Sequence, residues 1–217
     1  MTDIRSRPLP AIPRIIAVVR APSPASAIEA CRALVAGGVT GLEITYSTPD
    51  APAVIRELDA EFGERVFLGA GTITTEAHAT IAAEAGARFL VSPGTRRHLS
   101  AAMTATGLTV MTGALTPSEV MAAVEYGADV VKIFPASLGG PAFLRALRGP
   151  FPDLPLMPTG GVTPANIGDW FAAGAVAVGA GGDLLPAADL AAGRWGAIEH
   201  TARAFVEADL AAAGSAA

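Results

Sequence analysis

The chain has 217 residues, of which 51% are hydrophobic and 16% charged, and its formal net charge is −5. Such a chain can bury one large core, and its low charge argues against disorder. It has no basic run interleaved with aromatic residues, which excludes nucleic acid as an expected partner. No apolar run reaches the roughly 18 to 20 residues that cross a bilayer, so we expect no membrane association. The single cysteine, Cys31, rules out an intrachain disulfide, fits a reducing cytoplasmic location and is interpreted as a small buried hydrophobe.

Short apolar runs rich in β-formers alternate with alanine-rich amphipathic segments along the chain. In chain order, the predicted strand–helix pairs are 15–20 and 25–36, 41–46 and 51–62, 66–70 and 75–85, 89–92 and 96–106, 108–112 and 117–126, 130–134 and 142–147, 156–159 and 165–173, and 175–179 and 189–210. The strands are too apolar to have a face in water, which indicates a parallel sheet covered by helices.

Eight repeats of this unit favour a closed barrel over an open, doubly wound sheet. We therefore predict the α/β class, with a single (β/α)8 TIM barrel domain over residues 1–217, and we expect residues 1–13 and 211–217 to fray. In such barrels the reactive groups lie at the carboxyl ends of the strands and in the loops that follow them.

One lysine, Lys132, stands among 14 arginines. A position that keeps lysine in such a chain suggests a need for a primary amine that can lose its proton, which a guanidinium cannot supply. Lys132 lies in the predicted sixth strand between Val131 and Ile133, and alternation along a strand turns it into the barrel if its two neighbours face the helices.

Glu43 takes the same inward position in the second strand, between Leu42 and Ile44. Strands two and six lie opposite each other in an eight-stranded barrel, so Glu43 and Lys132 are expected to meet in its upper interior. A partly desolvated amine beside a carboxylate suits Schiff-base chemistry, in which the amine condenses with a ketone and the carboxylate moves protons. The alternative is a structural ion pair, but such pairs tend to break even against apolar packing.

Glycines follow the last two strands, as Gly160-Gly161 and as Gly179-Ala180-Gly181-Gly182. Barrels commonly bind phosphate in these two loops, where backbone N–H groups can approach an anion, so we expect a phosphate or carboxylate site there. Arg20, at the end of the first strand, could clamp a carboxylate or could simply be solvated. The three histidines lack the spacing of metal ligands, so neither a metal nor another cofactor is expected.

Six motifs together resemble the 2-keto-3-deoxy-6-phosphogluconate (KDPG) aldolases, a family that includes 4-hydroxy-2-oxoglutarate (KHG) and 6-phosphogalactonate (KDPGal) aldolases. The similarity runs from about residue 15 to 187, in the order Glu43-Ile44-Thr45, Gly69-Ala70-Gly71-Thr72, Ser92-Pro93-Gly94, Lys132-Ile133-Phe134-Pro135, Pro158-Thr159-Gly160-Gly161-Val162 and Val178-Gly179.

The resemblance implies a class I aldolase, with Lys132 forming the Schiff base and Glu43 acting as the general acid/base. It also implies that Thr72, Arg20 and Pro93 hold the pyruvate portion of a small 2-oxo acid, that Phe134 lines the pocket, and that the glycines of loops seven and eight hold a phosphate. A homotrimer is the expected assembly, because members of the family are commonly trimeric.

Three positions bear on the substrate. Thr159 is similar to the KDPG type, whereas the KDPGal type typically has valine there, so the gluconate epimer is preferred. Ser47 stands where some relatives place an arginine, and Gly182 followed by Asp183 replaces a serine that helps to bind phosphate, which keeps unphosphorylated 4-hydroxy-2-oxoglutarate open. The alternatives are a KDPGal aldolase, a phosphosugar epimerase or isomerase barrel, and a silent scaffold or engineered assembly subunit.

Overall fold

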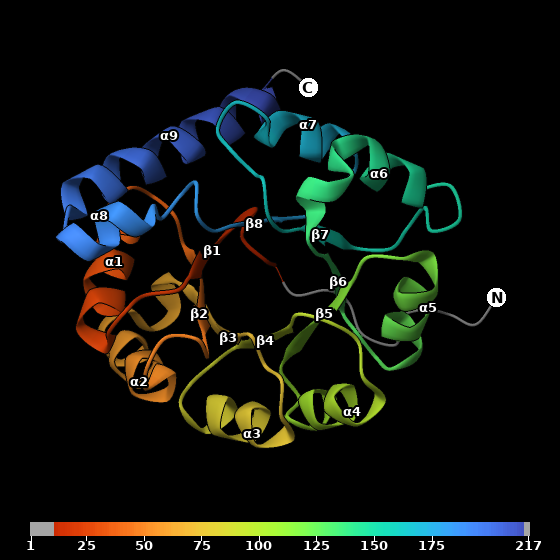
Figure 1. The fold of residues 1–217 in the computed structure, drawn as a ribbon, viewed down its shortest axis with the longest axis horizontal. Helices are drawn as coiled ribbons and strands as arrows, with labels where there is room; N and C mark the ends of the chain where they lie inside the picture. Colours follow the sequence, from red (N-terminus) through yellow and green to blue (C-terminus); the bar gives the residue numbers. More distant parts are fainter. Residues whose placement is uncertain (1–10, 215–217) are drawn as a thin grey trace.

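The computed structural model describes residues 11–214, which form a ring of helices around a barrel of eight parallel strands (Figure 1). The strands are β1 (Ile15–Val19), β2 (Gly41–Thr45), β3 (Phe67–Gly71), β4 (Phe89–Ser92), β5 (Thr109–Ala114), β6 (Val130–Ile133), β7 (Leu156–Pro158) and β8 (Val178–Ala180). Each strand from β1 to β7 pairs with the neighbour that precedes or follows it in the chain, and β1 also pairs with β8. A bridge between Thr159 and Gly179 brings the end of β7 to β8, so the barrel is nearly closed and the predicted (β/α)8 fold is confirmed.

The helices cover the outside of the barrel. They are α1 (Pro24–Ala36), α2 (Ala51–Phe62), α3 (Glu76–Glu84), α4 (Arg97–Ala105), α5 (Pro117–Glu125), α6 (Gly140–Leu147), α7 (Ile167–Ala172), α8 (Ala187–Ala192) and α9 (Trp195–Gly214). Two short 3-10 segments, η1 (Gly63–Arg65) and η2 (Ala136–Leu138), follow α2 and β6. None of the helices between residues 11 and 214 combines the length and hydrophobicity that a bilayer crossing demands.

The predicted last helix, 189–210, is wrong as a single element. Gly193 has a φ of 63°, in the left-handed region where glycine ends helices, and it separates α8 from α9. The prediction failed because an alanine-rich stretch keeps its helical periodicity across the break, and an isolated glycine within such a pattern does not by itself mark a helix end. The helix α9 continues to Gly214, four residues beyond the predicted end. Of the two segments expected to fray, 1–13 and 211–217, residues 211–214 are therefore helical, and 1–10 and 215–217 lie outside the described residues.

Alternation along the strands divides the apolar residues into two cores. The larger core lies between sheet and helices and includes Leu42 and Ile44 of β2 and Val131 of β6. The smaller core fills the barrel and consists of Ile16, Phe89, Val91, Met111, Val130, Met157 and Ala177. Leu42 and Ile44 face the helices on either side of Glu43, and Val131 faces them directly before Lys132. Glu43 and Lys132 must therefore face the inside of the barrel.

The amino terminus of α5 shows how local sequence fixes an element. Thr116 accepts a hydrogen bond from the Glu119 backbone N–H, and the Glu119 carboxylate accepts one from the Thr116 N–H, which makes a capping box. Together with a second backbone N–H, from Leu115, these bonds lower the pKa of Glu119, because they stabilise its ionised form.

Candidate active site

Lys132 and Glu43 meet inside the barrel, as their strand positions predicted. Lys132 Nζ lies 3.5 Å from Glu43 Oε1, and the two side chains are 7% and 0% exposed. The strands β2 and β6 stand four places apart in the eight-stranded order, so the pair spans the barrel rather than bridging neighbours. A buried amine and carboxylate at this distance can exchange a proton through one water, or directly after a small approach.

The Glu43 carboxylate is only partly satisfied. Its Oε1 faces Lys132, whereas its Oε2 is buried without a hydrogen-bond partner among residues 11–214. Gly71, at the end of β3, leaves the space that the carboxylate occupies, because a Cβ at Gly71 would lie 2.5 Å from Glu43 Cδ. A buried oxygen with unused acceptor capacity is suited to a proton or hydroxyl supplied by a bound molecule. The strand β3 runs to Gly71, one residue beyond the predicted end of the third strand.

Three more of the predicted residues stand at the same end of the barrel. The Phe134 ring, directly after β6, has its centroid 5.4 Å from Lys132 Nζ and is 38% exposed. Pro93 follows β4 and is exposed, and Thr72 follows β3 with a φ of 57°, an uncommon conformation for a residue with a side chain. All three therefore lie at the carboxyl ends of strands, the catalytic end of barrels of this class.

Thr159 follows β7 and is buried, at 5% exposure, with no hydrogen-bond partner for its Oγ1 among the described residues. Gly179 of β8 lies against this hydroxyl and provides the room for it. A hydroxyl held in this way has both its donor and its acceptor capacity available to a ligand.

The predicted glycine loops follow β7 and β8, which are neighbours through the Thr159–Gly179 bridge. Gly160 and Gly161 have φ values of 97° and 76°, which residues with a Cβ rarely adopt, so this loop depends on glycine. Gly182 has open space where a Cβ would stand, and Asp183 beside it is exposed. The two loops thus begin side by side at the carboxyl ends of β7 and β8.

Arg20 is exposed at the end of β1, and its Nε donates a hydrogen bond to Ser47 Oγ at 3.1 Å. No carboxylate forms an ion pair with Arg20 within the part of the chain that the structure describes. The sequence marks Ser47 only as a position where some relatives have an arginine. Its contact with Arg20 depends on how β1 and β2 are placed side by side.

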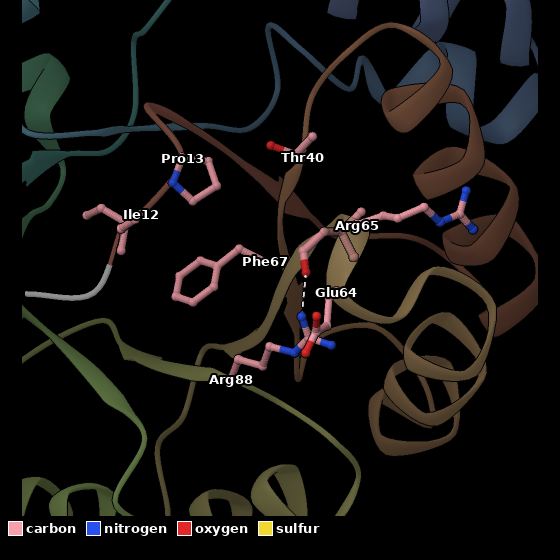
Figure 2. A pocket seen from close by; sticks show the side chains of 9 residues that line it. Ile12, Pro13, Thr40, Glu64, Arg65, Phe67 and Arg88 are labelled. Carbon is pink, nitrogen blue, oxygen red and sulfur yellow. Dashed lines mark hydrogen bonds between the residues drawn. The ribbon is translucent and has the colours of Figure 1, made fainter.

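A hollow of about 340 Å³ lies at the opposite end of the barrel, away from these residues. Figure 2 shows Phe67 in the middle of the residues that line it, with Ile12 on one side and Arg65 and Arg88 on the other. Thr40, which precedes β2, also lines it, so the hollow opens at the amino ends of the strands. Arg88 is used within the protein, because it donates to the Val66 carbonyl at 3.0 Å and pairs with Asp59 at 3.2 Å. This end of such a barrel serves stability rather than chemistry.

The cysteine and the three histidines lie in environments that do not indicate a reactive or metal-binding role. Cys31 is fully buried, and burial together with the nearby negative charge of Glu61 raises the pKa of its thiol far above the ordinary value. The His78 ring stacks on Tyr46 with centroids 4.1 Å apart, whereas His98 and His200 are exposed. Within residues 11–214, no group of three or more His, Cys, Asp or Glu could hold a metal ion.

A nearly closed barrel of parallel strands, with an inward amine and carboxylate at its catalytic end, defines a (β/α)8-barrel enzyme. The family model described as KDPG and KHG aldolase matches residues 11–201. The chain therefore belongs to the KDPG and KHG aldolase family, and it is an aldolase, a carbon–carbon lyase.

Individual relatives agree with this placement. The chain is 40% identical over 182 residues to the KHG/KDPG aldolase of Escherichia coli K12, with 83% of this chain and 85% of the relative covered. It is 36% identical over 195 residues to the 2-dehydro-3-deoxy-phosphogluconate aldolase of Pseudomonas aeruginosa, with coverage of 89% and 88%. The structure is similar to that of the KDPG aldolase from Legionella pneumophila with pyruvate captured as a covalent carbinolamine, at a TM-score of 0.82, 31% identity and coverage of 88% and 93%.

Proposed function

We propose that this protein is a class I aldolase that cleaves KDPG to pyruvate and glyceraldehyde 3-phosphate, with Lys132 as the Schiff-base lysine and Glu43 as the general acid/base. The observation that carries the proposal is the buried contact of 3.5 Å between Lys132 Nζ and Glu43 Oε1 at the catalytic end of the barrel. The pyruvate carbinolamine captured in the Legionella relative supports it, because a carbinolamine forms when an amine adds to a ketone.

The proposed reaction begins when the neutral Lys132 amine adds to C2 of the substrate. The resulting carbinolamine loses water and becomes an iminium. Glu43, directly or through one water, then takes the proton of the C4 hydroxyl as the C3–C4 bond breaks, and the bonding electrons pass into the iminium to give an enamine. The aldehyde leaves, C3 is protonated, and water hydrolyses the iminium to release pyruvate and restore the amine.

The remaining residues hold the two ends of the substrate in this proposal. Their place around Lys132 and at the neighbouring strand ends supports a division of roles. The pyruvate end is bound by Arg20, Thr72 and Pro93, Phe134 lines the pocket, and the phosphate end is bound by Gly160, Gly161, Gly181 and Gly182.

The preference for the gluconate epimer rests on Thr159. Its buried hydroxyl, which has no partner among the described residues, can orient the substrate hydroxyl at the carbon where the bond breaks. The loop after β8 points to a second substrate, because Gly182 offers no hydroxyl and Asp183 places a carboxylate beside the anion site. A carboxylate there weakens the binding of a phosphate, so cleavage of 4-hydroxy-2-oxoglutarate to pyruvate and glyoxylate is included in the proposal.

Borohydride trapping tests the central claim. Pyruvate with borohydride is expected to leave one reduced pyruvyl adduct, and because the chain has one lysine, an adduct on a side-chain amine can only lie on the peptide that contains Lys132. Lys132→Arg keeps the charge and is expected to fold but to give neither adduct nor turnover. An unmodified Lys132, or an adduct confined to the N-terminal amine, contradicts the mechanism.

Turnover of KDPG, its galactonate epimer and 4-hydroxy-2-oxoglutarate, followed through lactate dehydrogenase, ranks the substrates. An epimerase or isomerase would release no pyruvate in this assay. We further propose a cytoplasmic homotrimer. Large apolar side chains that are exposed in the single chain, among them Met121, Leu138 and Leu210, support an assembly that covers some of them. Light scattering at micromolar concentration is expected to give three times the mass of one chain.

A further inference from the structure

The carboxyl ends of β1 and β2 are joined by a chain of hydroxyl groups. Thr45, which is fully buried, donates from Oγ1 to the Val19 carbonyl oxygen at 2.8 Å. Thr45 Oγ1 also lies 2.8 Å from Ser47 Oγ, and Ser47 Oγ accepts the Arg20 Nε–H at 3.1 Å. The chain thus links a buried backbone carbonyl to an exposed guanidinium through two side chains.

The proton positions along this chain are determined by counting. A hydroxyl has one proton, and Thr45 uses its proton on the Val19 carbonyl, so Thr45 must accept the proton of Ser47. Ser47 Oγ then has lone pairs left for the Arg20 Nε–H, which can only donate. The direction therefore runs from Arg20 through Ser47 and Thr45 to Val19, and every member is satisfied.

A second hydroxyl fixes the backbone on both sides of Arg20. Thr48 Oγ1 accepts the Ala21 N–H at 3.1 Å and lies 3.4 Å from the Val19 carbonyl oxygen. The residue before Arg20 and the residue after it are thus both tied to the end of β2. The root of the arginine side chain is held as well as its Nε.

The tether decides on which side of β1 the guanidinium lies. The strand β1 pairs with β2 on one side and with β8 on the other (Figure 1). Ser47 draws Arg20 toward β2, the strand of Glu43, and away from the loop of Gly181 after β8. Nε is engaged by Ser47, and the two terminal nitrogens form no hydrogen bond or ion pair within residues 11–214. Two parallel N–H groups match the geometry of a carboxylate.

We propose that Ser47, supported by Thr45, is a positioning residue that aims Arg20 at the carboxylate of the 2-oxo acid. The inference rests on the proposed function, since the carboxylate concerned is that of the ketone bound to Lys132. Holding a long side chain before the substrate arrives reduces the conformational entropy that binding must remove. Ser47 thereby assigns Arg20 to the pyruvate end of the substrate and leaves the phosphate end to the glycine loops.

Borohydride trapping at Lys132 tests this role when two ketones are compared. Pyruvate carries the carboxylate, and methyl pyruvate presents the same ketone without the charge. Ser47→Ala is expected to raise the half-saturating concentration of pyruvate about tenfold, the effect of one hydrogen bond to a charged group, with little change in the limiting rate. Methyl pyruvate should be trapped by the variant and the wild type at the same concentrations. Ser47→Thr, which restores a hydroxyl, should return pyruvate to within about threefold of the wild type.

Two further variants sharpen the test. Thr45→Val keeps the side-chain shape but breaks the relay one step further in, and it should shift pyruvate in the same direction as Ser47→Ala. Ser118→Ala removes an exposed hydroxyl on α5, distant in sequence and on another element, and should change neither ketone. Thermal unfolding of each variant shows whether it is folded at the assay temperature.

The outcomes separate the two proposals. If the wild type traps neither ketone, both proposals are wrong. If it traps both but Ser47→Ala leaves pyruvate unchanged, or shifts the two ketones equally, only the role of Ser47 is overturned. Inorganic phosphate can also be added as a competitor in the trapping reaction. If Ser47→Ala changes only the protection of Lys132 by phosphate, Arg20 lies at the phosphate end of the substrate, and the proposed role of Ser47 is again overturned.

Discussion

Gly71 is the position where one added methyl group should disable the site without touching a reactive residue. A Cβ at Gly71 would lie 2.5 Å from both Cγ and Cδ of Glu43. The φ of Gly71 is not in the left-handed region, so alanine can adopt the backbone conformation and the clash falls on the glutamate. Gly71→Ala should therefore displace Glu43, the proposed general acid/base.

The size of the effect follows from this distance. Non-bonded carbon atoms prefer a separation of about 3.5 Å, so the carboxyl group must retreat by about 1 Å. The atom nearest to the added Cβ is Oε1, which faces Lys132 Nζ at 3.5 Å, so the displacement disturbs this contact. A displacement of about 1 Å costs on the order of 100-fold in rate, or about 2.7 kcal/mol in the activation free energy. Overpacking the buried strand end adds about 1–3 kcal/mol of destabilisation.

Two assays separate proton transfer from Schiff-base formation. In Gly71→Ala, exchange of the pyruvate methyl protons with D2O, followed by NMR, should slow about 100-fold, in step with pyruvate release from KDPG. Borohydride trapping of pyruvate should persist, because Lys132 is unchanged. The matched control is Gly196→Ala on α9, where a Cβ meets nothing within 4 Å, and it should keep full activity.

A double mutant tests whether the clash is the cause. Glu43→Asp shortens the side chain by one methylene and should slow the enzyme on its own. In the Gly71→Ala background it also relieves the clash. The loss of activation free energy in the double mutant should therefore be smaller than the sum of the losses in the two single mutants. Gly71→Ala with wild-type exchange and turnover would refute the reasoning, as would losses that are fully additive.

Three further predictions concern stability and reactivity. The capping box makes the folded-state pKa of Glu119 lower than the unfolded value, so its stabilisation is present above the ordinary carboxyl pKa and is lost as pH falls through the folded value. Glu119→Gln keeps an acceptor oxygen but removes the charge, so it should be about 0.5 kcal/mol less stable than the wild type at pH 7 in urea unfolding, and the difference should shrink toward pH 3. Cys31 should resist a disulfide thiol reagent at pH 8 until the protein unfolds, because burial raises the pKa of its thiol, and rapid labelling of the folded protein would contradict its surroundings. Arg14 pairs with Asp209 at 2.8 Å and stacks on the Phe171 ring of α7, so Arg14→Ala should lower the free energy of unfolding by about 2 kcal/mol. In a double-mutant cycle with Asp209→Ala, purely additive losses would show that the two side chains do not interact.

The strand positions of the central pair could be predicted because alternation along a strand is a local property. A side chain between two that face the helices must face the barrel, and Glu43 and Lys132 lie inside the barrel as this rule predicts. The eight repeats likewise imply a barrel, because a parallel strand that is apolar on both faces needs a cover on each. The lysine was conspicuous for a reason of composition, as the one amine among 14 guanidinium groups.

Other features required the tertiary structure, because they depend on residues that are far apart in the chain. The space that Gly71 leaves for Glu43 arises from the register between β2 and β3, which cannot be read from the order of residues in the chain. The link between Ser47 and Arg20 joins residues 27 positions apart, across two strand ends whose stagger is set by the closed barrel. Sequence by itself determined which side chains enter the barrel, since that follows from a period of two along each strand. Only the folded barrel decided which of them touch, since contact across a barrel is set by register and packing rather than by order along the chain.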